Sequence, residues 1–276
     1  MTGIDLVAFD LDGTTINNHR PMTRRVADAF AAAKASGAAT SVVSGRPTDM
    51  LGALLDADWL DWRITVNGAC VTDARTGEVR SRRPLAYDDA LEVLATGAPY
   101  DAAWNVFLPD GSYFERKCYS YMVSRDKGRR PSLHGLRRLV SGVRSVGSAE
   151  KVVRTHRADV DKIGASFPSP EACQAAAAAF ASRGDLEVVH MGPDELELTR
   201  AGVTKGSALG ELCRASGIDV RRAVVFGDSG NDISLTGRPC TFVAVANATP
   251  EIAAAADDHC PSVDDDGVAQ WIEARL

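Results

Sequence analysis

The chain has 276 residues, of which 45% are hydrophobic and 25% charged, and its formal net charge is -6. This length allows one large domain or two smaller ones, and the composition is typical of a folded globular protein. No apolar run approaches the ~18–20 residues of a membrane-spanning helix, and no basic segment of the secretory type stands at the N-terminus. We therefore expect a cytoplasmic protein without membrane contact. The acidic total argues against nucleic acid as a partner.

The opening third alternates strands and helices, with strands expected at residues 6–9, 38–43 and 64–66 and helices at 23–36 and 50–57. This β-α-β-α-β rhythm predicts a parallel sheet covered by helices. In such sheets, ligands bind beyond the carboxyl ends of the strands. Asp10, Ser44 and Asn67 all follow such ends.

The pattern changes near residue 84. We expect a helix at 88–96, a hairpin of strands 103–108 and 113–118, a strand at 161–167, a helix from Pro170 to about Gly184, and short strands at 187–191 and 195–199. The first rhythm returns near Ala201, with a helix at 204–216 and strands at 223–226 and 241–245. The prediction is a Rossmann-like core made of residues 1–83 and 191–276, interrupted by an inserted α+β domain at 84–190.

Charge and cysteine usage add two observations. Residues 115–157 hold twelve Lys/Arg and three Asp/Glu, a local charge of +9, so the rest of the chain sums to -15. This basic strip could face an anionic ligand or be an ordinary solvated surface. The six cysteines are scattered, with no Cys-x-x-Cys pair, and predict reduced thiols rather than zinc ligands or a disulfide framework.

The most informative segment is the stretch from Val7 to Ile16, in which a buried strand ends in Asp10-Leu11-Asp12-Gly13. Side chains at i and i+2 of an extended chain point the same way, so Asp10 and Asp12 arrive together at one strand end. Paired carboxylates usually bind a cation, perform acid–base chemistry, or supply a nucleophile beside its proton donor. The alternative is an ordinary Asp-Gly turn with both side chains solvated.

Three further pieces accompany this pair: Ser44-Gly45-Arg46, Lys205 at the start of a helix, and Gly227-Asp228-Ser229-Gly230-Asn231-Asp232 after a strand. In order and context the four pieces resemble the haloacid dehalogenase superfamily of phosphoryl-transfer enzymes. The likeness is strongest to its Cof-type (subfamily IIB) phosphatases, which carry a large α/β cap of the C2 type between the second and third motifs. The resemblance spans nearly the whole chain, including Asn67-Gly68 and the tail 266–269.

The resemblance implies a role for each matched residue. Asp10 is the expected nucleophile, forming an aspartyl-phosphate, and Asp12 the acid that protonates the leaving alkoxide and later the base that activates water. Ser44 is expected to donate its hydroxyl to the phosphate, and Lys205 to offset the negative charge. The residues expected to bind substrate are Gly45, Arg46, Asn67 and Asn247.

Clustered carboxylates repel a phosphate dianion unless a cation lies among them, and hard oxygen ligands favour Mg²⁺. The expected ligand set is Asp10, the backbone carbonyl of Asp12, Asp228, Asn231 and Asp232. The alternative for the last three is a polar turn in which Asn231 or Asp232 caps a helix.

The sequence thus predicts a cytoplasmic, Mg²⁺-dependent phosphatase, a monomer or homodimer, acting on a small phosphate ester such as a sugar phosphate. The inserted cap is expected to exclude water and select the substrate. Within the basic strip, Arg129, Arg130, Arg137 and Arg138 are expected to favour a second anionic group on that substrate. The alternatives are a phosphotransferase of the phosphomannomutase type and a weakly catalytic phospho-ligand sensor.

Overall fold

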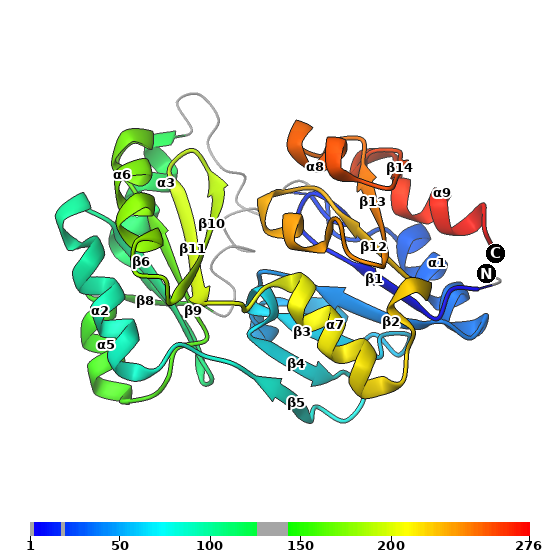
Figure 1. Ribbon diagram of the computed structural model, residues 1–276, viewed down its shortest axis with the longest axis horizontal. Helices are drawn as coiled ribbons and strands as arrows, with labels where there is room; N and C mark the ends of the chain where they lie inside the picture. Colours follow the sequence, from blue (N-terminus) through cyan, green and yellow to red (C-terminus); the bar gives the residue numbers. More distant parts are fainter. Residues whose placement is uncertain (1–2, 18–19, 126–142) are drawn as a thin grey trace. The chain divides into compact units, whose positions relative to one another are not determined.

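The computed structural model describes residues 3–17, 20–125 and 143–276, and the fold is drawn in Figure 1. The chain forms two compact units. The first contains Met1–Ser81 and Thr204–Leu276, and the second contains Arg82–Val203. The insert therefore extends to Val203 rather than ending at the predicted residue 190. Its last two strands are the reason, because they pair within the sheet of the second unit.

The first unit, the core, is built on an eight-stranded sheet in the order β14-β13-β12-β1-β2-β3-β4-β5. The strands from β14 through β3 run parallel, whereas β4 is antiparallel to β3. The expected α/β fold with a parallel core is confirmed. The strands are β1 (Leu6–Phe9), β2 (Ala39–Val43), β3 (Trp62–Thr65), β4 (Cys70–Asp73), β5 (Val79–Arg82), β12 (Ala223–Gly227), β13 (Thr241–Val245) and β14 (Asp258–Cys260).

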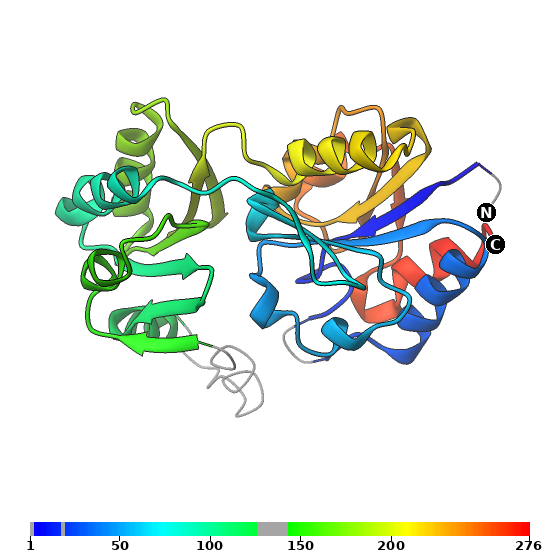
Figure 2. The ribbon, with the colours of Figure 1, turned by 90° about the horizontal axis from the view of Figure 1, so that it is seen from below.

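Helices cover both faces of the core sheet (Figure 2), which explains why β1 is apolar at every position. Val7 and Phe9 pack on the side of α1 (Arg24–Ala35) and α9 (Gly267–Glu273). Leu6 and Ala8 pack on the opposite side with α7 (Lys205–Ser216) and α8 (Pro250–Ala255). Burial of a side chain the size of Phe9 stabilises the fold by about 2–3 kcal/mol. The strand that carries Asp10 is thus held from both sides.

The helix expected at residues 50–57 is instead two 3₁₀ turns, η1 (Thr48–Met50) and η2 (Gly52–Asp56). Gly52, the first residue of η2, has φ +59°, a conformation that interrupts a right-handed helix. The other short 3₁₀ segments are η3 (Val66–Gly68), η4 (Ala98–Tyr100), η5 (Val220–Arg222), η6 (Gly230–Leu235) and η7 (Val263–Asp265).

The second unit, the cap, has a six-stranded sheet in the order β10-β11-β9-β6-β7-β8. Its strands are β6 (Ala103–Leu108), β7 (Gly111–Glu115), β8 (Val143–Val146), β9 (Lys162–Ser166), β10 (Leu186–Gly192) and β11 (Glu195–Arg200). One face packs against the helices α2 (Tyr87–Gly97), α5 (Ala149–His156) and α6 (Pro170–Ala181) in a single apolar cluster.

Strand β8 and helix α5 of the cap were not predicted from the sequence, and one expected strand differs in its end. The strand expected at 113–118 ends at Glu115, and Cys118 belongs to helix α3 (Arg116–Arg125), where its thiol contacts the carbonyl of Trp104. Residues 126–142 of the basic strip, which include Arg129, Arg130, Arg137 and Arg138, lie outside the described residues. In the part of the chain that the structure describes, no helix is both long and apolar enough to cross a membrane.

Candidate active site

The candidate site lies in the core unit, where β1, β2, β3 and β12 end. Asp10 follows β1 directly, and its backbone N–H donates to the carbonyl of Phe226 on β12 at 2.9 Å. The Thr15 hydroxyl donates to the Asp10 carbonyl at 2.8 Å and fastens the loop that leaves the strand. Because neighbouring parallel strands end at the same edge, residues far apart in the sequence meet here.

Lys205 lies between two of the carboxylates. Its ammonium donates to Oδ1 of Asp10 at 2.7 Å and to Oδ1 of Asp232 at 2.8 Å, and its side chain is completely buried. The lysine is the first residue of α7, and Thr204 caps that helix by accepting from the backbone N–H of Ser207 at 3.0 Å. A cation at a helix N-terminus opposes the helix dipole, so the two carboxylates must outweigh that cost.

The loop after β12 carries the other acidic residues. Asp232 accepts through Oδ2 from the backbone N–H groups of Asp228 and Ser229, at 2.9 and 3.1 Å. The Thr14 hydroxyl donates to Oδ1 of Asp228 at 2.7 Å. The two Asp232 contacts stabilise the loop after β12, and the hydrogen bond between Thr14 and Asp228 joins it to the loop after β1.

Gly13 makes this close approach possible. Its φ is +89°, and a Cβ at this position would lie only 2.3 Å from Oδ2 of Asp228. A side chain here would collide with the Asp228 carboxylate in a backbone conformation that L-residues rarely adopt. Glycine is therefore required on both counts.

The cluster is short of positive charge. One carboxylate oxygen from each of Asp10, Asp228 and Asp232 lies within 4.8 Å of the others. Burial, opposed in part by Lys205, holds the pKa of Asp10 well above its usual range. Burial and the Asp232 carboxylate raise the pKa of Asp228 to about 7. Burial lowers the pKa of Lys205, but Asp10 and Asp232 outweigh burial and raise it.

With all three carboxylates ionised, a single ammonium leaves two negative charges unbalanced. Three hard oxygen donors with that imbalance suit a divalent cation of the Mg²⁺ type. The donor set therefore fits the metal expected from the sequence.

Asp12 makes a separate ion pair. Arg46 Nε donates to Asp12 Oδ2 at 2.6 Å, and Nη2 donates to Oδ1 at 2.5 Å, so the pair is bidentate. The Asp12 side chain is 52% exposed, in contrast to 6% for Asp10. The two aspartates leave the same strand end but have different partners and different access to solvent.

Ser44 and Asn67 lie on the neighbouring loops. The Ser44 hydroxyl accepts from the backbone N–H of Arg46 at 3.1 Å, so Gly45 forms the turn between them. The Asn67 N–H donates to the Ser44 carbonyl at 3.1 Å, and the Asn67 side chain accepts from Asn231 at 3.2 Å. Val66 and Asn67 both have positive φ, a strained backbone that these contacts stabilise.

Asn247 connects the loops around the site. Its amide donates to the Gly13 carbonyl at 2.7 Å, and its side-chain oxygen accepts from Val263 N–H at 2.9 Å. Both polar groups thus contact the backbone. The sequence prediction did not include Thr14 and Thr15 among the site residues. Both directly follow the Asp-Leu-Asp-Gly segment, and this adjacency is the signal that could have identified them.

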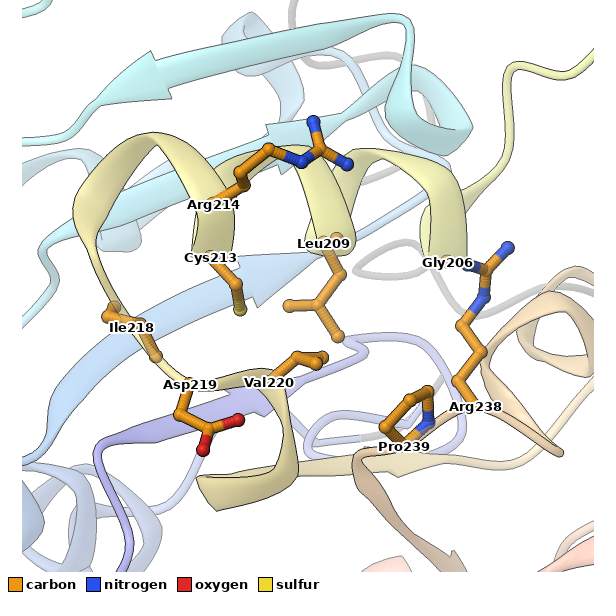
Figure 3. A pocket seen from close by; sticks show the side chains of 10 residues that line it. Gly206, Leu209, Cys213, Arg214, Ile218, Asp219, Val220, Arg238 and Pro239 are labelled. Carbon is orange, nitrogen blue, oxygen red and sulfur yellow. The ribbon is translucent and has the colours of Figure 1, made fainter.

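A groove of the core unit lies beside α7 (Figure 3). Leu209, Cys213 and Val220 line its apolar floor, and Arg214 and Arg238 stand at its edge. None of the clustered carboxylates lines this groove. It takes no part in the site built around Asp10.

Comparison with known families confirms the resemblance seen in the sequence. The fold and the acidic cluster define a hydrolase of the phosphoryl-transfer class. The chain belongs to the haloacid dehalogenase-like hydrolase family, whose profile matches residues 7–272 and so includes both units.

Individual relatives agree with the family. The Bacillus subtilis protein YxeH is 28% identical over 277 residues, covering 97% of this chain and 96% of YxeH. Pyridoxal phosphate phosphatase YbhA of Escherichia coli is 23% identical over 278 residues and 98% of each chain. The fold also matches the solved structure of the subclass IIB sugar phosphatase BT4131, with a TM-score of 0.82, 22% identity and 98% coverage of each chain. The expected enzyme class, a phosphoric monoester hydrolase, is confirmed.

Proposed function

We propose that the protein is a Mg²⁺-dependent phosphatase that hydrolyses a small phosphate monoester through an aspartyl-phosphate on Asp10. The observation that carries this proposal is the group formed by the buried Asp10, Lys205 and Asp232 and the half-buried Asp228 at the edge of the parallel sheet. Burying several charges together costs folding stability, and such clusters are typical of sites that perform chemistry.

The contacts of Asp10 support its proposed role as the nucleophile. Among the described residues, its Oδ1 accepts the side-chain hydrogen bond from Lys205, which leaves Oδ2 to attack phosphorus. The ammonium fixes the carboxylate and favours its ionised form, in opposition to the effect of burial. As the ester P–O bond breaks, Asp12 donates its proton to the leaving oxygen, and it then accepts a proton from the attacking water.

The residues proposed to hold Mg²⁺ are Asp10, the backbone carbonyl of Asp12, and Asp228. Both oxygens of Asp232 already accept hydrogen bonds, from Lys205 and from two backbone N–H groups, which favours a supporting role. Asn231 supports the same loop through Asn67. When bound, Mg²⁺ supplies positive charge that balances the carboxylates and the phosphate.

The phosphate itself is proposed to meet the hydroxyl of Ser44 and the backbone N–H of Gly45, as in other anion sites built from loop amides. Asn67 and Asn247 are proposed to contribute mainly by fixing the surrounding loops, since their side chains contact Asn231 and Gly13. The proposed cap role remains substrate selection.

The names of two relatives support the proposed substrate class. YbhA is named for pyridoxal phosphate and BT4131 for sugar phosphates. We propose that this chain hydrolyses a phosphorylated metabolite of similar size, with a sugar phosphate first, in the cytoplasm.

The test is phosphate release from a panel of sugar phosphates, pyridoxal phosphate and p-nitrophenyl phosphate, with and without Mg²⁺. We expect release that requires the metal and is lost in Asp10→Asn. A variant that keeps wild-type activity without Asp10, or transfer of the phosphoryl group to a second sugar without free phosphate, would contradict the proposal. The latter outcome would favour the phosphotransferase.

A further inference from the structure

We propose that Arg46 is a positioning residue for Asp12, and that it acts on catalysis through that carboxylate rather than as a ligand of the phosphate. The proposal deepens the proposed function and rests on it. It replaces the sequence-based expectation that Arg46 binds substrate directly.

The geometry of the pair is the first argument. Two parallel N–H···O contacts, at 2.6 and 2.5 Å, use both oxygens of Asp12 and two of the three nitrogens of the guanidinium. The third nitrogen, Nη1, donates to the carbonyl of Met50 at 3.1 Å. Asp12 occupies the Nε–Nη2 edge of the guanidinium, so a bidentate phosphate contact through that edge would first require two charge-assisted hydrogen bonds to break.

The second argument is the difference in mobility between the partners. Arg46 is fixed at its backbone, because its N–H donates to the Ser44 hydroxyl at 3.1 Å and its carbonyl accepts from Val66 at 3.0 Å. Its side chain is 23% exposed, whereas that of Asp12 is 52% exposed. An exposed aspartate without a partner samples several rotamers, so Arg46 is the fixed member that selects one of them.

The chemical consequence depends on the leaving group. Before the transfer, Asp12 carries its proton on one carboxyl oxygen and keeps its contact with Arg46 through the other. When the ester P–O bond breaks, the electron pair goes to the leaving oxygen and that proton moves from Asp12 to the same oxygen. The ionised Asp12 then accepts both hydrogen bonds from Arg46. An alkyl alkoxide needs this proton, whereas p-nitrophenolate is stable without it. A misplaced Asp12 therefore slows alkyl esters selectively, whereas a lost phosphate ligand slows both esters alike.

The experiment compares kcat/KM for two esters. One is an alkyl ester, either glucose 6-phosphate or the best alkyl substrate of the panel, and the other is p-nitrophenyl phosphate. The value of kcat/KM depends only on the steps up to and including release of the alcohol. It therefore isolates the step in which Asp12 acts as an acid. The variants are Arg46→Gln and Arg46→Lys, the latter keeping the charge but losing the fork. Arg25→Gln is the matched control, because Arg25 makes the same bidentate pair with Glu273, at 2.9 and 2.5 Å, between α1 and α9.

We expect Arg46→Gln to lower kcat/KM by about 10–100-fold for the alkyl ester and by less than about threefold for p-nitrophenyl phosphate, since general acids contribute about 10²–10⁴-fold. Arg46→Lys should recover part of the loss, and Arg25→Gln should match the wild type on both esters. In an Asp12→Asn background, Arg46→Gln should have no further effect, because the partner through which it acts is gone.

Equal losses on both esters, or a loss that persists in the Asp12→Asn background, would overturn the positioning role and restore Arg46 as a phosphate ligand while leaving the proposed phosphatase intact. Absence of phosphate release by the wild-type protein from every ester would overturn the proposed function, and the positioning role with it.

Discussion

Replacement of Lys205 by methionine tests the account of the buried charges. The side chain is completely buried, and its ammonium contacts Asp10 at 2.7 Å and Asp232 at 2.8 Å. Methionine is similar in length and retains most of the packing but carries no charge. The substitution leaves two buried carboxylates without their cation.

At pH 8 without Mg²⁺, we expect the free energy of unfolding to fall by about 3–5 kcal/mol, the usual cost of removing one partner from a buried ion pair. Asp232 keeps two backbone N–H donors, so most of the loss falls on Asp10, which loses its side-chain partner. Without the ammonium the pKa of Asp10 rises further above its unfolded value. The folded variant then binds an additional proton as the pH falls, so its stability is regained at low pH and lost as the pH rises through that folded pKa.

The assay is urea unfolding at pH 8 and at pH 5.5, followed by tryptophan fluorescence. Trp59, Trp62 and Trp271 belong to the core unit, so the signal reports mainly the unit that contains Lys205. Lys34→Met is the matched control, because Lys34 contacts Asp61 at the same 2.8 Å on the surface. An exposed pair is worth about 0–1 kcal/mol.

If the free energy of unfolding falls no more for Lys205→Met than for Lys34→Met, the reasoning is refuted. It would also be refuted by a loss that is the same at both pH values. Either result would mean that the carboxylates do not depend on the buried ammonium.

Three further predictions concern the metal site and the thiols. Since the pKa of Asp228 is about 7, the apparent Mg²⁺ affinity should fall by up to about tenfold for each pH unit below that value. Calorimetry at pH 6 and pH 8 measures this, and equal dissociation constants would contradict it. Gly13→Ala should weaken Mg²⁺ binding and phosphate release at least about tenfold, because the new Cβ would lie 2.3 Å from Asp228; a variant with wild-type metal affinity would show that the approach can relax. Burial raises the pKa of Cys118 and of Cys260 to about 12, so both thiols should resist a thiol reagent at pH 8 until the chain unfolds. Peptide mass mapping locates the labelled cysteines. Rapid labelling of either thiol in the native protein would contradict its burial.

The fold was largely predictable because its signals are local. The run from Leu6 to Phe9 and its alternation with amphipathic helices indicate a parallel sheet without any knowledge of contacts. Asp10 and Asp228 follow adjacent strands, so the topology alone brings them to one edge. Lys205 joins them because Thr204 caps a helix that begins at that edge.

Other features depend on contacts that a sequence does not encode locally. The insert continues to Val203 because β10 pairs with β11 and β11 pairs with β9, and the second pairing is a non-local interaction. The segment expected as one helix at 50–57 is divided by the backbone conformation of Gly52. The pair between Arg46 and Asp12 is set by side-chain rotamers on two loops, and the same residues in sequence are equally compatible with Arg46 bound to phosphate.

The central claim, an aspartyl-phosphate on Asp10, is tested most directly by trapping the intermediate. The protein is mixed with a substrate of the panel and Mg²⁺, quenched in acid within a turnover, digested and examined by mass spectrometry. The account predicts one phosphorylated peptide, containing Asp10, whose phosphate is released by hydroxylamine and which is absent in Asp10→Asn. Turnover of substrate with the phosphoryl group on another residue, or on none, would contradict it.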